Sequence, residues 1–278
     1  ADCHVEKDTT IYNAALSACE KGSEWSMALQ LWRDMSDASV QIDTITYSAV
    51  VSACEKGDQW WLALQLFREM SKGHVARDTI IYGAAVIACE KGDQWLLALQ
   101  LIRDMIHDHV YPDTITYNAA ISACEKVGVW RGALQILREM SDRFVVMDAV
   151  TYNAALSACG KGGEWWRALH LLHQMEDSRL DRDAVTYGAA VGACAKGGEW
   201  SRALQLVREM VDACIEGNTF TFGALICACE GFGQGLWAQQ FLPELAGCHV
   251  RVKHLRQTMN PFCKQSMVTT WPSNQFQR

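Results

Sequence analysis

Residues 9–43 read TTIYNAALSACEKGSEWSMALQLWRDMSDASVQID, and this string decides the fold because it returns, with variations, along most of the chain. Residues 44–78 read TITYSAVVSACEKGDQWWLALQLFREMSKGHVARD, so Tyr, Cys, Lys, Trp, Met and Asp recur at a spacing of 35 residues. A fixed period of this length indicates a tandem array of one supersecondary unit. We identify seven units, at residues 9–43, 44–78, 79–113, 114–148, 149–183, 184–218 and, in degenerate form, 219–253.

Each unit predicts two helices. The first is typified by residues 9–21, with Asp8 and Thr9 as its N-cap and Gly22 where a left-handed C′ glycine would end it. The second is typified by residues 24–35, whose apolar positions follow the 3.6-residue period of a helix. One hairpin cannot bury its own apolar face, so neighbouring hairpins must stack. The predicted fold class is all-α, an α-solenoid of stacked helix-turn-helix repeats.

The two ends of the chain depart from the period. We expect residues 1–8 to be the end of a preceding repeat, and residues 219–253 to cap the stack. Residues 254–278 lack the period, and we expect a disordered C-terminal tail there. No run of eighteen apolar residues occurs, so no membrane partner is expected.

Composition limits the function classes. A formal net charge of −7 argues against a uniformly basic surface that coats nucleic acid, although a local basic stripe remains possible. We interpret the recurring cysteines as reduced, apolar packing residues, because stacked helices are too far apart for disulfides. One cysteine per repeat forms no ligand cluster, so neither a metal nor a cofactor is expected. These cysteines are Cys19, Cys54, Cys89, Cys124, Cys159, Cys194 and Cys229.

A polar stripe runs across the predicted first helices. Asn13, Ser17 and Lys21 are four residues apart and therefore share one helix face. The lysine recurs as Lys56, Lys91, Lys126, Lys161 and Lys196. Such a column of lysines has two interpretations. The lysines could be solvated side chains at helix C-termini, where the helix dipole favours a positive charge. They could instead match the regularly spaced charges of a polyanion. The position of Asn13 varies among Asn, Ser and Gly. A constant lysine beside such a variable position is expected where a protein holds every phosphate of a nucleic acid in the same way but contacts each base differently.

The repeat resembles a known family. The strings TYNAAISACEK (116–126) and ALQILREM (133–140), closed by Asp148, look like the pentatricopeptide repeat in its plain 35-residue form. The resemblance covers residues 9–253, and the early tryptophan of the second helix, as at Trp130, is similar to variants of dinoflagellate-like algae. It implies a right-handed superhelix that binds single-stranded RNA, one base per repeat, in organellar RNA processing, stability or translation. The implied location is a mitochondrion or plastid.

The resemblance also assigns roles to residues. The implied base-reading pairs are Asn13 with Asp43, Ser48 with Asp78, Gly83 with Asp113, Asn118 with Asp148, Asn153 with Asp183 and Gly188 with Asn218. The implied base-sandwiching residues are Thr10, Ile45, Ile80, Ile115, Val150, Val185 and Phe220. The six lysines, Lys21, Lys56, Lys91, Lys126, Lys161 and Lys196, would hold phosphates. The implied RNA footprint is 5′-UGGUUA-3′.

Other interpretations stay open. An aspartate before a threonine is an ordinary helix cap, which would explain the aspartates without RNA. The acidic balance and tryptophans such as Trp61 and Trp166 would also suit a protein-binding scaffold. His170 and His173 lie three residues apart, but in one unit only, and no nucleophile–base pair, phosphate loop or metal spacing accompanies them. We therefore expect no catalytic residues and no enzymatic activity.

Overall fold

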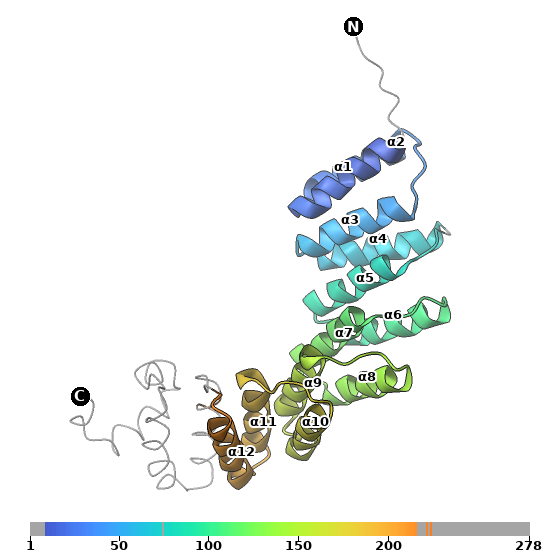
Figure 1. Cartoon of the computed structure of the whole chain (residues 1–278). Coiled ribbons are helices and arrows are strands. Elements are labelled where there is room, and N and C mark those ends of the chain that lie inside the picture. The colour runs from blue at the N-terminus through green and yellow to red at the C-terminus, as the bar shows by residue number, and fades with distance from the viewer. Residues whose placement is uncertain (1–8, 74, 216–220, 222, 224–278) are drawn as a thin grey trace, which may run out of the picture. The chain divides into compact units, whose positions relative to one another are not determined.

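The computed structural model describes residues 9–73, 75–215, 221 and 223, and in these residues all regular structure is α-helical, without strands (Figure 1). The helices fall into two compact units, one ending at Met147 and the other beginning at Asp148. The predicted all-α class of stacked hairpins is confirmed. Residues 1–8, the predicted end of a preceding repeat, lie outside the described residues. So do the predicted seventh repeat and tail, apart from Thr221 and Gly223.

Each unit is a series of antiparallel helix pairs. The first unit contains α1 (Thr9–Gly22), α2 (Trp25–Asp37), α3 (Thr44–Lys56), α4 (Trp60–Lys72), α5 (Thr79–Lys91), α6 (Trp95–His107), α7 (Thr114–Val127) and α8 (Trp130–Asp142). The second unit contains α9 (Ala149–Gly162), α10 (Trp165–Asp177), α11 (Ala184–Lys196) and α12 (Trp200–Asp212). In the described residues, the odd-numbered helix is the first helix of each pair and the even-numbered helix is the second.

An aspartate starts the first helix of most pairs. The carboxylate of Asp43 accepts a hydrogen bond from the backbone N–H of Thr46 at 2.8 Å, and the Thr46 hydroxyl accepts from the backbone N–H of Asp43 in return. This reciprocal cap satisfies two backbone donors that a helix start otherwise leaves unpaired. An aspartate carboxylate accepts the same backbone hydrogen bond at the start of four further helices, at Asp78, Asp113, Asp148 and Asp183, and the return bond to a threonine hydroxyl forms again at Asp148 and Asp183.

The left-handed residue that follows the first helices lies one position later than the sequence predicts. Gly22 was expected to adopt the left-handed conformation, and this prediction is wrong, since Gly22 is the last residue of α1 and the positive φ belongs to Ser23, at 57°. In the next repeat Gly57 has a φ of −81° and Asp58 has 58°. The N–H of the residue after Asp58 reaches back to the carbonyl of Cys54 at 2.8 Å, which closes a Schellman motif around a left-handed residue.

The glycine before this turn is explained by packing between repeats. A Cβ atom on Gly57 would lie 2.4 Å from the ring of Trp25, and one on Gly92 would lie 2.5 Å from the ring of Trp60. In the second unit, Gly197 and Trp165 repeat the arrangement at 2.4 Å. In these three contacts the tryptophan that opens a second helix packs on the bare backbone of the next repeat, where an added Cβ would collide with it.

The core consists of equivalent residues from successive repeats. Inside the first unit α1, α3, α5 and α7 pack in series, and each second helix also packs on the first helix that follows it; α9, α10 and α11 do the same in the second unit (Figure 1). The recurring tyrosine, cysteine and methionine positions are buried, as at Tyr82, Cys89 and Met105. Burial raises the pKa of the thiols of Cys54, Cys89 and Cys159 to about 12, so they stay protonated and pack as small apolar groups.

The tryptophan–glycine contact gives a test with a built-in control. We expect Gly92→Ala to destabilise the protein by about 1–3 kcal/mol, because the new methyl group must displace the ring of Trp60. Gly22→Ala should be neutral or stabilising by up to about 1 kcal/mol, because alanine favours a helix and the nearest atom to a Cβ there is 3.5 Å away. Urea denaturation followed by circular dichroism measures both, and equal effects would contradict the packing explanation.

Candidate functional site

The first helices present a column of exposed aliphatic side chains close to their N-termini. Ile45, Ile80 and Ile115 are 61%, 65% and 68% exposed, while Val150 and Val185 in the second unit are 59% and 55% exposed. Thr10 is exposed at the same repeat position, and Phe220 lies outside the described residues. Branched apolar residues exposed at one position of five successive repeats are unusual on a solvated surface and are typical of a binding surface.

Beside this column, the predicted base-reading residues of the first repeat contact each other. The Asn13 amide donates to both carboxylate oxygens of Asp43, at 3.2 and 3.4 Å, and the Thr46 hydroxyl donates to Asn13 Oδ1 at 2.7 Å. Burial alone would raise the pKa of Asp43, but the hydrogen bonds from Thr46 and Asn13 hold that pKa below its ordinary value. The carboxylate is therefore charged, oriented and able to act only as an acceptor.

The fifth repeat reproduces this arrangement. Asn153 donates to Asp183 at 3.5 Å, and the Thr186 hydroxyl donates to Asn153 at 2.7 Å. The pKa of Asp183 is also lowered, since the hydrogen bonds from Thr186 and Asn153 outweigh its desolvation. Two repeats in different units thus hold an asparagine–aspartate pair in one orientation.

The remaining predicted pairs differ. The hydroxyl of Ser48 is buried and has no hydrogen-bond partner among the described residues, which is costly for a polar group. Gly83 leaves space beside the next cap, since a Cβ there would meet only Thr116 Oγ1, at 3.5 Å. Gly188 is buried. Its predicted partner Asn218 lies outside the described residues, and Asn118 and Asp148 belong to different units.

Three lysines of the column each have an acidic partner that was not predicted from the sequence. Lys56, Lys91 and Lys126 each form an ion pair with the glutamate that precedes the lysine of the previous repeat. Those glutamates are Glu20, Glu55 and Glu90. Their own recurrence every 35 residues was visible in the sequence, but nothing local indicated that they would bind the lysine of the following repeat.

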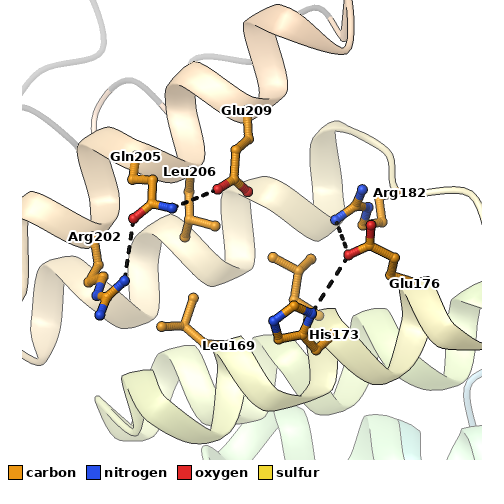
Figure 2. Close-up of a pocket in the computed structure, with 9 residues that line it drawn as sticks. Leu169, His173, Glu176, Arg182, Arg202, Gln205, Leu206 and Glu209 are labelled. Atoms are coloured by element: carbon orange, nitrogen blue, oxygen red, sulfur yellow. Dashed lines mark hydrogen bonds and ion pairs between the residues drawn. The ribbon is translucent and has the colours of Figure 1, made fainter.

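A separate cavity of about 320 Å³ lies between α10 and α12 (Figure 2). There Glu176 lies 3.3 Å from Arg182 and 3.7 Å from the Nδ1 atom of His173, while Gln205 donates to Glu209 at 3.0 Å. The polar groups of this cavity thus contact one another, and its helices are second helices rather than those of the aliphatic column. His173, one of the two histidines considered above, has a side chain that is 81% exposed.

No group of three or more His, Cys, Asp or Glu side chains suited to a metal ion occurs in residues 9–73 and 75–215. Over the same part of the chain, none of the helices has the length and apolar character needed to cross a membrane.

The family can be identified from the repeats and their arrangement. The model of the pentacotripeptide-repeat region of PRORP matches residues 4–184, and the PPR repeat model matches residues 185–215. The chain belongs to the pentatricopeptide repeat family. This confirms the resemblance drawn from its sequence. A comparison with curated proteins gave no match.

Solved structures show the same fold. The pentatricopeptide repeat protein PPR10 from maize, in complex with an 18-nt psaJ RNA element, is 23% identical with a TM-score of 0.62; the match covers 88% of this chain and 34% of PPR10. The PPR domain of Arabidopsis thaliana protein-only RNase P 1, in complex with tRNA, is 19% identical with a TM-score of 0.54, over 67% of this chain and 94% of that domain. PRORP2 of A. thaliana is 14% identical with a TM-score of 0.56, over 60% of this chain and 38% of PRORP2. This chain therefore spans little more than a third of PPR10 and PRORP2.

The lowered pKa of Asp43 predicts how the cap responds to acid. Its contribution to stability is complete above the unfolded-state pKa, about 3.9, and is lost as the pH falls through the lower folded-state pKa. Asn is as good a cap as Asp but does not titrate there. The stability difference between wild type and Asp43→Asn should therefore be constant above about pH 5 and should shrink in acid.

Urea midpoints measured between pH 2.5 and 7 check this expectation. Asp37→Asn is the matched control, since Asp37 is exposed at the end of α2 and its carboxylate has neither a hydrogen bond nor an ion pair within the described residues. A stability difference for Asp43→Asn that does not change with pH would show that hydrogen bonds to its charged form contribute nothing.

Proposed function

We propose that this chain binds single-stranded RNA selectively by sequence, with each of the first six repeats holding one base. The observation that carries the proposal is the column of exposed aliphatic residues, which stands beside oriented polar pairs on the same first helices. Membership of the pentatricopeptide repeat family supports it, because repeats of this family are known to read one base through a few side chains each. The RNA complexes of PPR10 and of the PRORP1 domain provide further support.

The spacing of the aliphatic column suits a base. Packed helices lie about 8–10 Å apart, and a flat ring in van der Waals contact on both faces needs about 7–8 Å. A base could therefore enter between side chains such as Ile45 and Ile80, which project from the neighbouring helices α3 and α5. Such stacking is tolerant of sequence, since every base has two flat faces.

Selectivity would then come from the polar pairs. In the first and fifth repeats the asparagine is already oriented by its aspartate and by a threonine, so little ordering is needed when a base edge arrives. The hydroxyl of Ser48 lacks a hydrogen-bond partner among the described residues, and it would have to rotate out of its buried position to meet a base edge. By the family's code these pairs correspond to the footprint 5′-UGGUUA-3′, and we place the target among mitochondrial or plastid transcripts undergoing processing, stabilisation or translation.

RNA binding can be tested directly with a short unstructured RNA that contains UGGUUA and with a scrambled RNA of the same composition. We expect tighter binding of the first, and a plot of log K against log salt with a clearly negative slope, of about −0.7 for each lysine whose phosphate contact releases a counterion and of about −4 if all six do so. Fluorescence anisotropy over a series of salt concentrations measures both quantities. No binding of either RNA would reject the proposed function, whereas equal binding would reject only the base assignment.

The code can be tested inside the second unit. Asn153→Ser removes the amide that contacts Asp183, and it should move the preference at the fifth base from U toward G. Each well-placed base contact is worth about 1–3 kcal/mol, so the change should reach roughly tenfold in relative affinity for RNAs that differ only at that base. Ser201→Ala, at an exposed position of α12, is a control that should leave the preference unchanged. A U preference that survives Asn153→Ser would overturn the assignment of this residue.

A protein-binding scaffold is the second candidate, favoured by two exposed tryptophans. Trp61 on α4 is 53% exposed and Trp166 on α10 is 51% exposed, with the guanidinium of Arg167 4.3 Å from the ring of Trp166. Exposed tryptophan and arginine are typical of energetically important interface residues. Affinity capture with and without nuclease separates the two functions, because a partner bound directly to the protein survives removal of RNA.

A further inference from the structure

The lysine column, defined as Lys21, Lys56, Lys91, Lys126, Lys161 and Lys196, is not a uniform row of cations. Lys56 lies 2.9 Å from the carboxylate of Glu20, and Lys126 lies 3.3 Å from that of Glu90. Lys91 lies 2.9 Å from both Glu55 and Asp58. In the first unit three successive lysines therefore have their charge balanced by acids of the preceding repeat.

Lys91 is the most firmly held of these side chains. Besides its two carboxylates, its ammonium donates to the backbone carbonyl of Glu55 at 2.6 Å. Desolvation alone would lower the pKa of Lys91, but its hydrogen bonds to Asp58 and Glu55 raise that pKa above its ordinary value. Glu55 is itself buried, with 8% of its surface exposed, so solvent screens this pair less than its neighbours.

The second unit differs in sequence and in contacts. The residue equivalent to Glu55 is Gly160, and the one equivalent to Asp58 is Gly163, so neither can neutralise the lysine of the following repeat. That lysine, Lys196, is exposed, and its one hydrogen bond within the described residues goes to the backbone carbonyl of Lys161, at 3.4 Å. The ammonium of Lys196 is thus available to an external anion without loss of an ion pair.

We propose that Glu20, Glu55 and Glu90 are built-in competitors of the RNA backbone, and that they set how strongly Lys56, Lys91 and Lys126 attract phosphate. The inference rests on the proposed RNA-binding function and deepens it. A phosphate must replace a carboxylate at each of these lysines, and the displaced carboxylate stays close enough to repel it. Lys196 requires no such exchange. Its attraction for an RNA phosphate is therefore stronger than that of Lys56, Lys91 and Lys126 in the first unit.

The exchange is chemically reasonable. The pairs of Lys56 with Glu20 and of Lys126 with Glu90 are partly exposed and therefore weak, because water and salt screen them, so a phosphate can displace these carboxylates; the buried Glu55 gives up Lys91 less readily. The consequence concerns selectivity. Phosphate contacts carry no sequence information. Weakening them therefore lowers the affinity for every RNA, and a larger part of the remaining binding energy comes from the base contacts. A purely structural role, in which the pairs only join neighbouring repeats, predicts instead that their loss changes stability and not RNA binding.

The decisive variant is the triple substitution Glu20→Gln, Glu55→Gln and Glu90→Gln, which keeps size and hydrogen-bonding capacity but removes three charges. From the roughly two- to five-fold worth of one exposed ion pair, we expect about ten- to hundredfold tighter RNA binding at 0.1 M salt. The slope of log K against log salt should steepen by up to about 2, or about 0.7 for each lysine released. The gain should be equal for matched and scrambled RNA.

The matched control is Asp37→Asn, Asp142→Asn and Asp177→Asn, which removes the same number of charges. These aspartates lie at the C-termini of second helices, at the opposite end of the hairpin and about 20 Å from the lysine column along a 13-residue helix. Because that distance exceeds the screening length of about 10 Å at 0.1 M salt, we expect less than a twofold change. Circular dichroism and urea denaturation verify that both variants fold.

If the triple glutamine variant fails to fold, Glu20→Gln alone tests the proposal at the most exposed pair, with an expected gain of about two- to fivefold. If wild type binds RNA and the folded glutamine variant has the same affinity and salt slope, the competitor role is wrong while the proposed function stands. If the charge-matched control gains as much as the glutamine variant, a general charge effect replaces the specific one. If neither wild type nor variant binds any RNA, the proposed function itself fails, and this inference fails with it.

Discussion

The apolar contact between one hairpin and the first helix of the next is the interaction on which the rest of the structure depends. A two-helix unit of 35 residues leaves one face of its tyrosine, cysteine and methionine positions uncovered, and only an equivalent unit can cover it. Repeating the same contact forces equivalent residues into columns. The aliphatic column, the aspartate caps and the lysine column are all consequences of this stacking, because within each unit it places one residue per repeat on a common face.

The aspartates show how a structural and a candidate functional role coincide. At Asp43 one carboxylate caps α3 and also receives the amide of Asn13 from the previous repeat. A residue with both duties is held rigidly, because moving it would break a helix cap. This rigidity is useful for a recognition surface, since a preordered contact loses less conformational entropy on binding. It also means that stability and selectivity have to be measured separately for each substitution there.

Charge in this chain is organised locally, and the net value of −7 hides that organisation. The first unit balances its central lysines with acids of neighbouring repeats, whereas the second unit has glycine at both acidic positions that precede Lys196. Because screening limits charges to about 10 Å, an anion near the lysine column responds to these neighbours rather than to the whole molecule. The same column can therefore be strongly or weakly attractive along its length.

By itself the sequence determined the period, the all-α class, the aspartate caps and the buried positions, because these depend on spacings within one helix or on exact recurrence. It also placed Asn13, Ser17 and Lys21 on one face. Only the tertiary structure decided that the left-handed turn residue is Ser23 rather than Gly22, that Gly57 accommodates the ring of Trp25, and that Glu20 binds Lys56. The last two contacts join residues more than thirty positions apart. Their geometry depends on how one hairpin stacks on the next, and no local pattern in the chain encodes that.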